Sequence, residues 1–323
     1  MIYLDRRIFT ILLLGFSSGL PFWLTSGTLA FWLAESGSSN TAIGLFALVG
    51  VPYTFKFLWS PLVDRLPIPM LTHILGRRRS WMLLSQILMA FAIFALAQMH
   101  PAENLMSMAA LAVLVAFLSA TQDIVIDAYR VDILDEKTQG AGAATIVFGY
   151  RIGMLTSGAG ALYLASYLPW SVVYQIMAIL VGIGIVTTLL SKEPSKRDEE
   201  SVAHHNWFQK AVIAPFSDFM TRPNWWVILV FITCYKLGDA FVSNMTSPFY
   251  LGVGFSKIEI ANITKIFGVF ANLFGAFLGG LAVSRFGILK GLFVCGLFQM
   301  LSNLVFVVQA YAGHDLSVLV FAI

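Results

Sequence analysis

The sequence predicts an all-α membrane protein, built as a six-helix bundle followed by a second, incomplete bundle. Of the 323 residues, 58% are hydrophobic and only 11% are charged, whereas soluble proteins have about 45–50% apolar and about 25% charged residues. A soluble fold of this size has too little core to bury such an apolar excess. The second observation is that long apolar runs alternate with short basic loops, which sets the number and direction of the spans.

Nine runs of about 20 or more mostly apolar residues divide the chain, and a tenth begins near residue 316. Because backbone groups cannot stay unpaired in lipid, each span must be a helix or a strand of a closed barrel, and runs of this length fit helices. Arg6 and Arg7 precede the first run as in a signal peptide, but the run is too long and lacks a small-residue cleavage site, so we expect a retained span. The runs are 8–33, 41–63, 80–99, 105–128, 139–165, 170–190, 225–250, 258–283 and 288–311.

Basic residues concentrate in alternate loops, and the positive-inside rule places those loops and the amino terminus in the cytoplasm. The opposite loops contain a single basic residue, Lys257. The net charge of +3 is spread over several short loops and forms no nucleic-acid patch.

The predicted organisation has three parts. Residues 1–190 form the six-helix bundle, 191–224 a cytoplasmic linker, and 225–323 a partial second bundle of three helices and the start of a fourth. The charged run 192–200 is expected to be solvated. Apolar residues at helical spacing over 207–220 predict a helix on the membrane surface.

Two basic loops share a pattern. After the second span the chain reads Asp64-Arg65 and then Gly76-Arg77-Arg78-Arg79, and after the eighth it reads Ser284-Arg285-Phe286-Gly287. Both are similar to the cytoplasmic signature loop of the major facilitator superfamily, with Ser60 and Ser284 as departures and an insertion before Gly76. The repetition implies a two-halved transporter with gating residues Asp64, Arg65, Arg77, Arg78 and Arg285. The alternative is that these residues only anchor the loops.

Ionisable residues inside spans are costly unless they are paired or wetted, so each is a candidate functional residue. They are Lys56, Asp123, Asp127, Arg151, Lys236, Asp239 and Lys265. Lys56 and Asp123 lie at similar depths, roughly 12 and 10 Å from the cytoplasmic ends of their helices, and are expected to meet.

From these residues we assign proton coupling to Asp123, Asp127 and Asp239. Gln122 and Tyr150 adjoin charged positions, and we assign substrate binding to Lys56, Gln122, Tyr150, Arg151 and Lys236. Trp23 and Trp32 are expected to add aromatic faces for sugar rings. The alternatives are snorkelling for Lys56, a silent intrahelical pair for Lys236 with Asp239, an anchoring role for Asp127, and interface anchors for the tryptophans.

The sequence does not favour an enzyme. All five histidines lie in loops without metal-ligand spacing, and Cys234 and Cys295 lie inside apolar runs. The predicted outer loops are too short to form a catalytic cleft. We expect neither a cofactor nor a metal.

Several segments closely resemble the AmpG muropeptide permeases of Gram-negative bacteria. They include 15–21, 24–29, 55–62, 76–79, 119–128, 140–144, 149–155 and 235–240, in order along nearly the whole chain. The resemblance implies a major facilitator fold and a monomeric inner-membrane importer of anhydro-muropeptides (GlcNAc–anhydro-MurNAc, with or without peptide) for peptidoglycan recycling. It also implies proton symport and an influence on β-lactamase induction.

The resemblance also implies at least twelve helices, whereas this sequence ends inside its tenth run. We therefore expect the second half to be incomplete. Two alternatives stay open: a carrier of acetyl-coenzyme A or another anionic solute of the same superfamily, and a membrane sensor or assembly partner that does not transport.

Overall fold

The computed structural model describes residues 5–135, 138–194, 214–221, 224–271, 275 and 288–322. Every regular element in these ranges is a helix, which confirms the predicted all-α class. The elements of the first part are α1 (Arg6–Leu24), α2 (Gly27–Glu35), α3 (Asn40–Leu45), η2 (Phe46–Gly50), α4 (Val51–Phe55), η3 (Lys56–Leu58), α5 (Ser60–Arg65), α6 (Leu71–Leu75), α7 (Arg77–Ala97), α8 (Pro101–Ile133), α9 (Gln139–Leu155), η5 (Thr156–Gly160), α10 (Ala161–Ala165), α11 (Trp170–Leu180) and α12 (Gly182–Leu190). Later elements are α13 (Ala214–Thr221), α14 (Trp225–Val253), α15 (Lys257–Ile260), η7 (Ala261–Phe267), α17 (Ile288–Ala312) and α18 (Leu316–Phe321).

Where the structure describes them, the predicted apolar runs coincide with one helix or with several consecutive helices. Six of these in the described chain are long and apolar enough to cross a membrane, fewer than the nine runs predicted. The run 41–63 is one of the six, although turns divide it. Of the three other runs, 139–165 and 225–250 are continuous helix, whereas 258–283 extends into residues outside the described ranges.

The predicted span 41–63 is the clearest departure, because it forms a series of short helices instead of one. Pro52 lies in the first turn of α4 and Pro61 in the first turn of α5. Proline has no amide hydrogen to donate to the preceding turn, so each of these residues begins a helix more easily than it continues one. The break leaves Lys56 at the start of a short 3₁₀ turn.

Helices α1 and α9 cross with their backbones in close contact at two pairs of glycines spaced four residues apart, Gly15 with Gly19 and Gly149 with Gly153. A Cβ atom added to Gly19 would lie 2.1 Å from the Tyr150 carbonyl oxygen, and one added to Gly149 would lie 2.1 Å from the Leu12 carbonyl oxygen. At Gly15 and Gly153 the corresponding distances to the partner helix are 2.5 and 2.3 Å. Only residues without a side chain permit this approach. Gly275 and Gly279 have the same spacing, but Gly275 faces open space and Gly279 lies outside the described residues.

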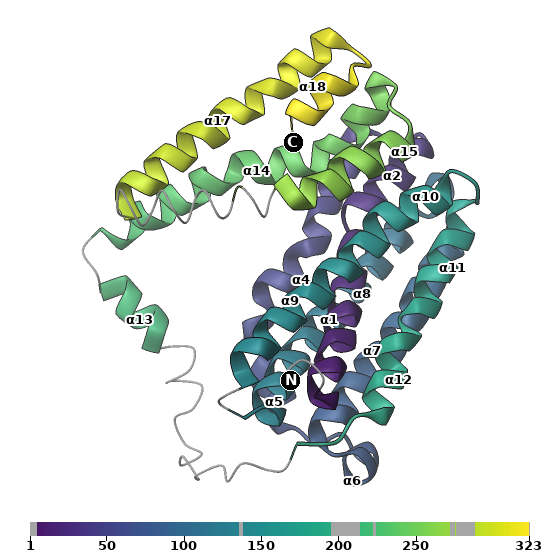
Figure 1. The fold of residues 1–323 in the computed structure, drawn as a ribbon, viewed down its shortest axis with the longest axis vertical. Coiled ribbons are helices and arrows are strands. Elements are labelled where there is room, and N and C mark those ends of the chain that lie inside the picture. Colours follow the sequence, from purple (N-terminus) through teal and green to yellow (C-terminus); the bar gives the residue numbers. More distant parts are fainter. Residues whose placement is uncertain are drawn as a thin grey trace.

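The helices from α1 to α12 form a bundle with two ends (Figure 1). We call the end that holds the start of α1, the start of α7 and the end of α12 the N-terminal face, and the opposite end the far face. The later helices α14, α15 and α18 approach the bundle at the far face, whereas α13 and the start of α14 lie apart from it.

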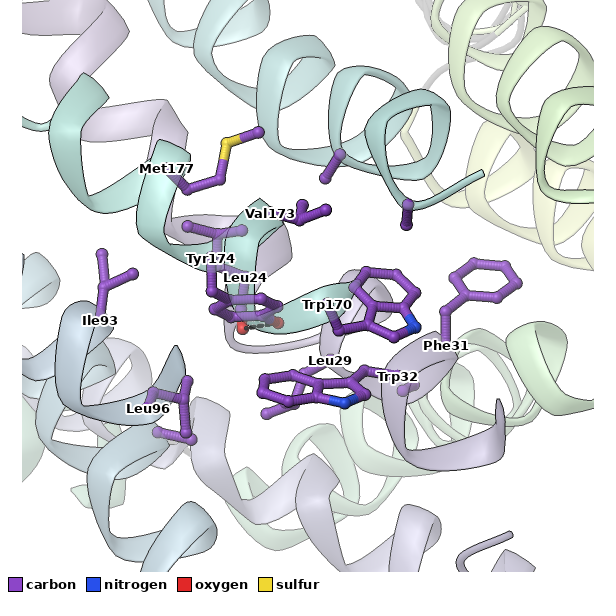
Figure 2. Close-up of a cluster of buried hydrophobic side chains, with 14 of the residues drawn as sticks. Leu24, Leu29, Phe31, Trp32, Ile93, Leu96, Trp170, Val173, Tyr174 and Met177 are labelled. Atoms are coloured by element: carbon purple, nitrogen blue, oxygen red, sulfur yellow. Dashed lines mark hydrogen bonds between the residues drawn. The ribbon is translucent and has the colours of Figure 1, made fainter. Parts of the chain in front are cut away.

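A buried aromatic cluster fills the bundle near the far face (Figure 2). Trp32 stacks on Trp170 with ring centroids 6.2 Å apart, and the Tyr174 hydroxyl donates to the Leu24 carbonyl oxygen over 3.0 Å. Trp32 is only 5% exposed. The expectation that Trp32 offers a ring to a substrate is therefore wrong, because its faces are covered by packing.

Candidate functional site

The candidate site centres on Asp123, in the last third of α8 (Pro101–Ile133). The carboxylate is half-buried and accepts a hydrogen bond of 2.5 Å from the Ser18 hydroxyl of α1. Lys56 and Asp127 lie within electrostatic reach of Asp123. Among the described residues, however, no cation comes within ion-pair distance of it. Lys56 and Asp123 thus share a neighbourhood, but they do not form the direct contact that the sequence predicts.

Three buried polar atoms in this region, two on α8 and one on α4, lack hydrogen-bond partners within the described chain. They are the Tyr53 hydroxyl, the Ser119 hydroxyl and the Gln122 amide nitrogen. The Tyr53 hydroxyl faces Ser119, while the Gln122 side-chain oxygen accepts from Ser17 over 3.2 Å. Unfilled hydrogen-bonding capacity in an apolar bundle is costly, so this cluster suits water or a polar ligand.

Aromatic rings border the same region. Phe22 packs against Trp23, Tyr53 and Tyr150, with centroid distances of 5.5, 6.2 and 6.4 Å. The hydroxyl of Tyr150 lies within electrostatic reach of both Asp123 and Arg151. The site therefore combines a carboxylate, phenol groups and apolar ring surface within one bundle.

Arg151 follows Tyr150 on α9 and has no carboxylate within ion-pair distance in the described residues. Its guanidinium lies 4.0 Å from the Met154 sulfur. An arginine inside an apolar bundle needs an anionic or polar partner. Its position beside Tyr150 leaves it able to bind an anionic group, which is the role that the sequence predicts.

The structure describes the side chains of only some of the other predicted charged residues. Asp127 is exposed, one helical turn from Asp123 toward the N-terminal face. Lys236 and Asp239 lie on α14 and Lys265 on η7, but their side chains are outside the described residues. Arg285 also lies outside the described ranges. The roles assigned to these residues stay predictions.

A second charged group lies at the N-terminal face, where Arg78 connects three helices. Its Nη1 atom lies 2.5 Å from the Asp64 carboxylate of α5, and its Nε atom lies 3.0 Å from the Asp132 carboxylate of α8. Sequence reasoning singled out Asp64 and Arg78 but missed Asp132, whose signal was only its place near the end of a span. The neighbouring Arg65 ends α5 and Arg77 begins α7.

The position of Glu193 corrects the expectation that the charged run 192–200 is solvated. Its carboxylate accepts hydrogen bonds from the backbone N–H groups of Arg78 and Arg79, at 2.8 and 3.1 Å, and so caps the N-terminus of α7. The Arg79 side chain in turn donates to the carbonyl oxygens of Thr188 and Leu189 at the end of α12. Glu193 is therefore a helix cap and not part of a freely solvated linker.

Gly76 allows that cap to form. It has a φ of +84°, and a Cβ atom there would lie 2.3 Å from the Glu193 side chain. Glycine is the residue that meets both requirements. No group of three or more possible metal ligands occurs within the described residues.

Sequence reasoning missed Ser18, Tyr53 and Ser119. Each is a hydroxyl residue within an apolar run, and that pattern is the only signal that points to them. Hydroxyl residues in membrane helices often bond to their own backbone, so the pattern alone does not separate a site residue from a structural one.

Comparison with known proteins relates the whole chain to membrane transporters. The profile of the Major Facilitator Superfamily matches residues 11–323. The anhydromuropeptide permease of Escherichia coli is 45% identical over 304 residues, which are 94% of this chain and 60% of that protein. The chain thus spans about 60% of the length of this relative. The putative transporter AmpG 4 of Rickettsia conorii is 41% identical over 310 residues, 95% of this chain and 74% of that protein.

Two solved structures share the fold at low sequence identity. A mutant of the nucleoside transporter NupG matches with a TM-score of 0.64 and 16% identity, over 87% of this chain and 69% of that chain. A bacterial homolog of the human lysosomal transporter Spinster, in an inward-facing and unoccupied conformation, matches with a TM-score of 0.61 and 16% identity, over 87% and 62%.

Proposed function

The chain belongs to the major facilitator superfamily and, within it, to the AmpG-type transporters, and from this membership we propose that it carries anhydro-muropeptides across the inner membrane for peptidoglycan recycling. Transport is driven by the proton gradient. The identity to the Escherichia coli permease over 94% of the chain supports this substrate class.

The observation that carries the mechanism is the half-buried Asp123 carboxylate, which is held by Ser18 and lies near Lys56 and Tyr150, with Arg151 also near Tyr150. A carboxylate in an apolar bundle is stabilised by taking up a proton or by facing a cation. In this proposal Asp123 alternates between these two states. Each change of state favours one direction of opening, which links proton movement to substrate movement.

Substrate binding is assigned to the surrounding groups. Arg151 and Lys56 bind carboxylates of the muropeptide, with Lys236 as a further cation on α14. Gln122 and Tyr150 bind polar groups of the sugar. The ring surface of Phe22 and Trp23 packs on the sugar rings. Asp127 and Asp239 assist proton transfer.

The proposal also includes the orientation of the chain in the membrane and its division into two lobes. The N-terminal face is cytoplasmic because it carries most of the basic residues, and the far face is periplasmic. The two lobes comprise residues 1–190 and 225–323, joined by the linker 191–224, and the transporter is a monomer. Asp64, Arg65, Arg77, Arg78 and Arg285 control opening of the cytoplasmic side, supported by the ion pairs from Arg78 to Asp64 and Asp132.

The test is uptake of radiolabelled GlcNAc–anhydro-MurNAc by proteoliposomes that contain the full chain. We expect accumulation when the outside is more acidic than the inside, and none without a proton gradient. A sensor would bind the sugar without accumulating it. Competition with unlabelled acetyl-coenzyme A separates the two substrate classes, because only a muropeptide carrier is unaffected by it.

The coupling residue is tested in the same assay with Asp123→Asn, which keeps the shape of the side chain and removes its charge. We expect gradient-driven uptake to be lost while insertion and folding are retained. The matched control is Glu103→Gln, which removes an exposed carboxylate from the other end of the same helix. Unchanged uptake in Asp123→Asn would exclude Asp123 from the coupling mechanism.

A further inference from the structure

The two parts of the chain meet at one end only of the described structure. Their principal contacts join α14 to α2 and α3, α15 to α10, and η7 to η5, all toward the far face. The hydrophobic core is continuous there, because Tyr250, Phe255 and Ile260 pack into the cluster that contains Trp32 and Trp170. The start of α14 lies apart from the bundle, to one side of it (Figure 1).

One charged side chain occupies the centre of this contact. The Lys257 ammonium, at the start of α15, lies 3.0 Å from the Glu35 carboxylate at the end of α2. It donates to the Ala165 carbonyl oxygen at the end of α10 over 2.5 Å. It also lies 5.2 Å from the centroid of the Trp170 ring.

The bundle side of this contact is already assembled around Glu35. The indole N–H of Trp170 donates to the same Glu35 oxygen over 2.7 Å, and the Trp170 ring is stacked on Trp32. The carboxylate, the ring face and the carbonyl at a helix C-terminus all favour a cation at this position. Lys257 is the group that fits this position, and it comes from the other part of the chain.

The ion pair at this contact is partly accessible to water. The side chains of Lys257 and Glu35 are 19% and 28% exposed, so water can solvate both charges when they separate. Deeply buried ion pairs, in contrast, separate only at a large desolvation cost. Beside the apolar core, the neighbouring polar contacts are two hydrogen bonds, namely Tyr163 with Asn262 and Ser247 with the Gly27 carbonyl oxygen.

We propose that Lys257, Glu35 and Trp170 form a releasable latch that closes the far face, and that the latch must break each time this face opens. The inference rests on the proposed transport function for its purpose, but its structural claim is independent of any substrate. It gives a role to the only basic residue that the sequence places in the far-side loops.

A cysteine at position 247 reports whether the far face is open. Ser247 is 4% exposed at the contact between α14 and α2, so a thiol there reacts with a maleimide only when the two parts separate. The parent protein carries Ser247→Cys together with Cys234→Ser and Cys295→Ser, which remove both native thiols. The full chain is held in lipid nanodiscs, which leave both faces accessible to the reagent.

We expect Lys257→Met to raise the maleimide labelling rate at position 247 by about fivefold or more, the lower range of coupling between two states of a protein. Lys257→Arg keeps the charge and should label close to the parent rate. Lys290→Met removes an exposed lysine on α17 and should also leave the rate unchanged. If Lys257→Met labels at the parent rate, or if Lys290→Met raises labelling equally, the latch is refuted.

Trp170→Phe provides a second measurement that does not depend on the folding of the lysine variant. It retains a ring but removes the N–H that holds Glu35, so we expect labelling between the parent rate and that of Lys257→Met. A parent-like rate in this variant would contradict the role of Trp170. Because no substrate is present, a failure of muropeptide uptake leaves these outcomes unaffected, and a failure of the latch leaves the uptake result unaffected.

Discussion

The crossing of α1 and α9 can be tested with Gly149→Ala. The added Cβ atom would lie 2.1 Å from the Leu12 carbonyl oxygen and 3.0 Å from the Phe16 amide nitrogen, both rigid backbone atoms. Ordinary contact begins at 3.4 Å, so the helices must separate by about 1.3 Å, the difference between 3.4 and 2.1 Å. Over-packing of this kind costs about 1–3 kcal/mol.

The matched control is Gly160→Ala, farther along the same continuous run of helix. A Cβ atom there meets nothing closer than the Leu155 oxygen at 3.8 Å. This substitution should be neutral or stabilise the protein by up to about 1 kcal/mol, because alanine restricts the unfolded chain more than glycine does. The two variants make the same chemical change, so they differ only in the space that receives the methyl group.

The free energy of unfolding can be measured by titrating dodecyl sulfate into dodecyl maltoside micelles and following tryptophan fluorescence. We expect Gly149→Ala to be less stable than Gly160→Ala by about 2 kcal/mol or more. The separation also moves Tyr150 and Arg151 away from Ser18 and Asp123, so uptake should fall in Gly149→Ala alone. Equal stability of the two variants would show that the helices do not cross this closely.

Two further predictions concern helix caps. Glu193→Gln should lower the free energy of unfolding by about 0.5–1 kcal/mol, because the charge at the start of α7 is lost. A parent-like free energy of unfolding in this variant would contradict the role of the Glu193 charge as a cap of α7. Hydrogen bonds from Arg7 hold the pKa of Asp5 below its ordinary value of 3.8. Ionised Asp5 therefore stabilises α1 above about pH 4. This stabilisation is lost as the pH falls through the lowered pKa. Asp5→Asn should therefore be less stable than the parent at about pH 6, with a difference that shrinks below about pH 4, and a difference that is constant with pH would contradict this assignment.

The helix ends illustrate how local chemistry is readable from the sequence. Proline at positions 52 and 61 divides the second span, as its missing amide requires. The glycine pairs at 15/19 and 149/153 anticipate a close helix crossing. These features depend on residues a few positions apart, so the chain itself contains the information.

Contacts between different helices cannot be predicted from the sequence in the same way. Helical spacing shows which residues share a face of one helix, but not which face of another helix lies opposite. The sequence therefore favoured Lys56 as the partner of Asp123. In the structure the Asp123 carboxylate instead accepts a hydrogen bond from Ser18, 105 positions away. For the same reason the sequence favoured a contact between Trp32 and a substrate, although Trp170 stacks on the Trp32 ring in the structure.

The sequence by itself determined that this chain is helical and apolar enough to cross a membrane, and which charges are costly inside its spans, because hydropathy acts locally. Only the tertiary structure decided how those charges are used. Whether Lys257 meets Glu35, or Arg78 meets Asp64 and Asp132, depends on helix positions set by the packing of the whole bundle.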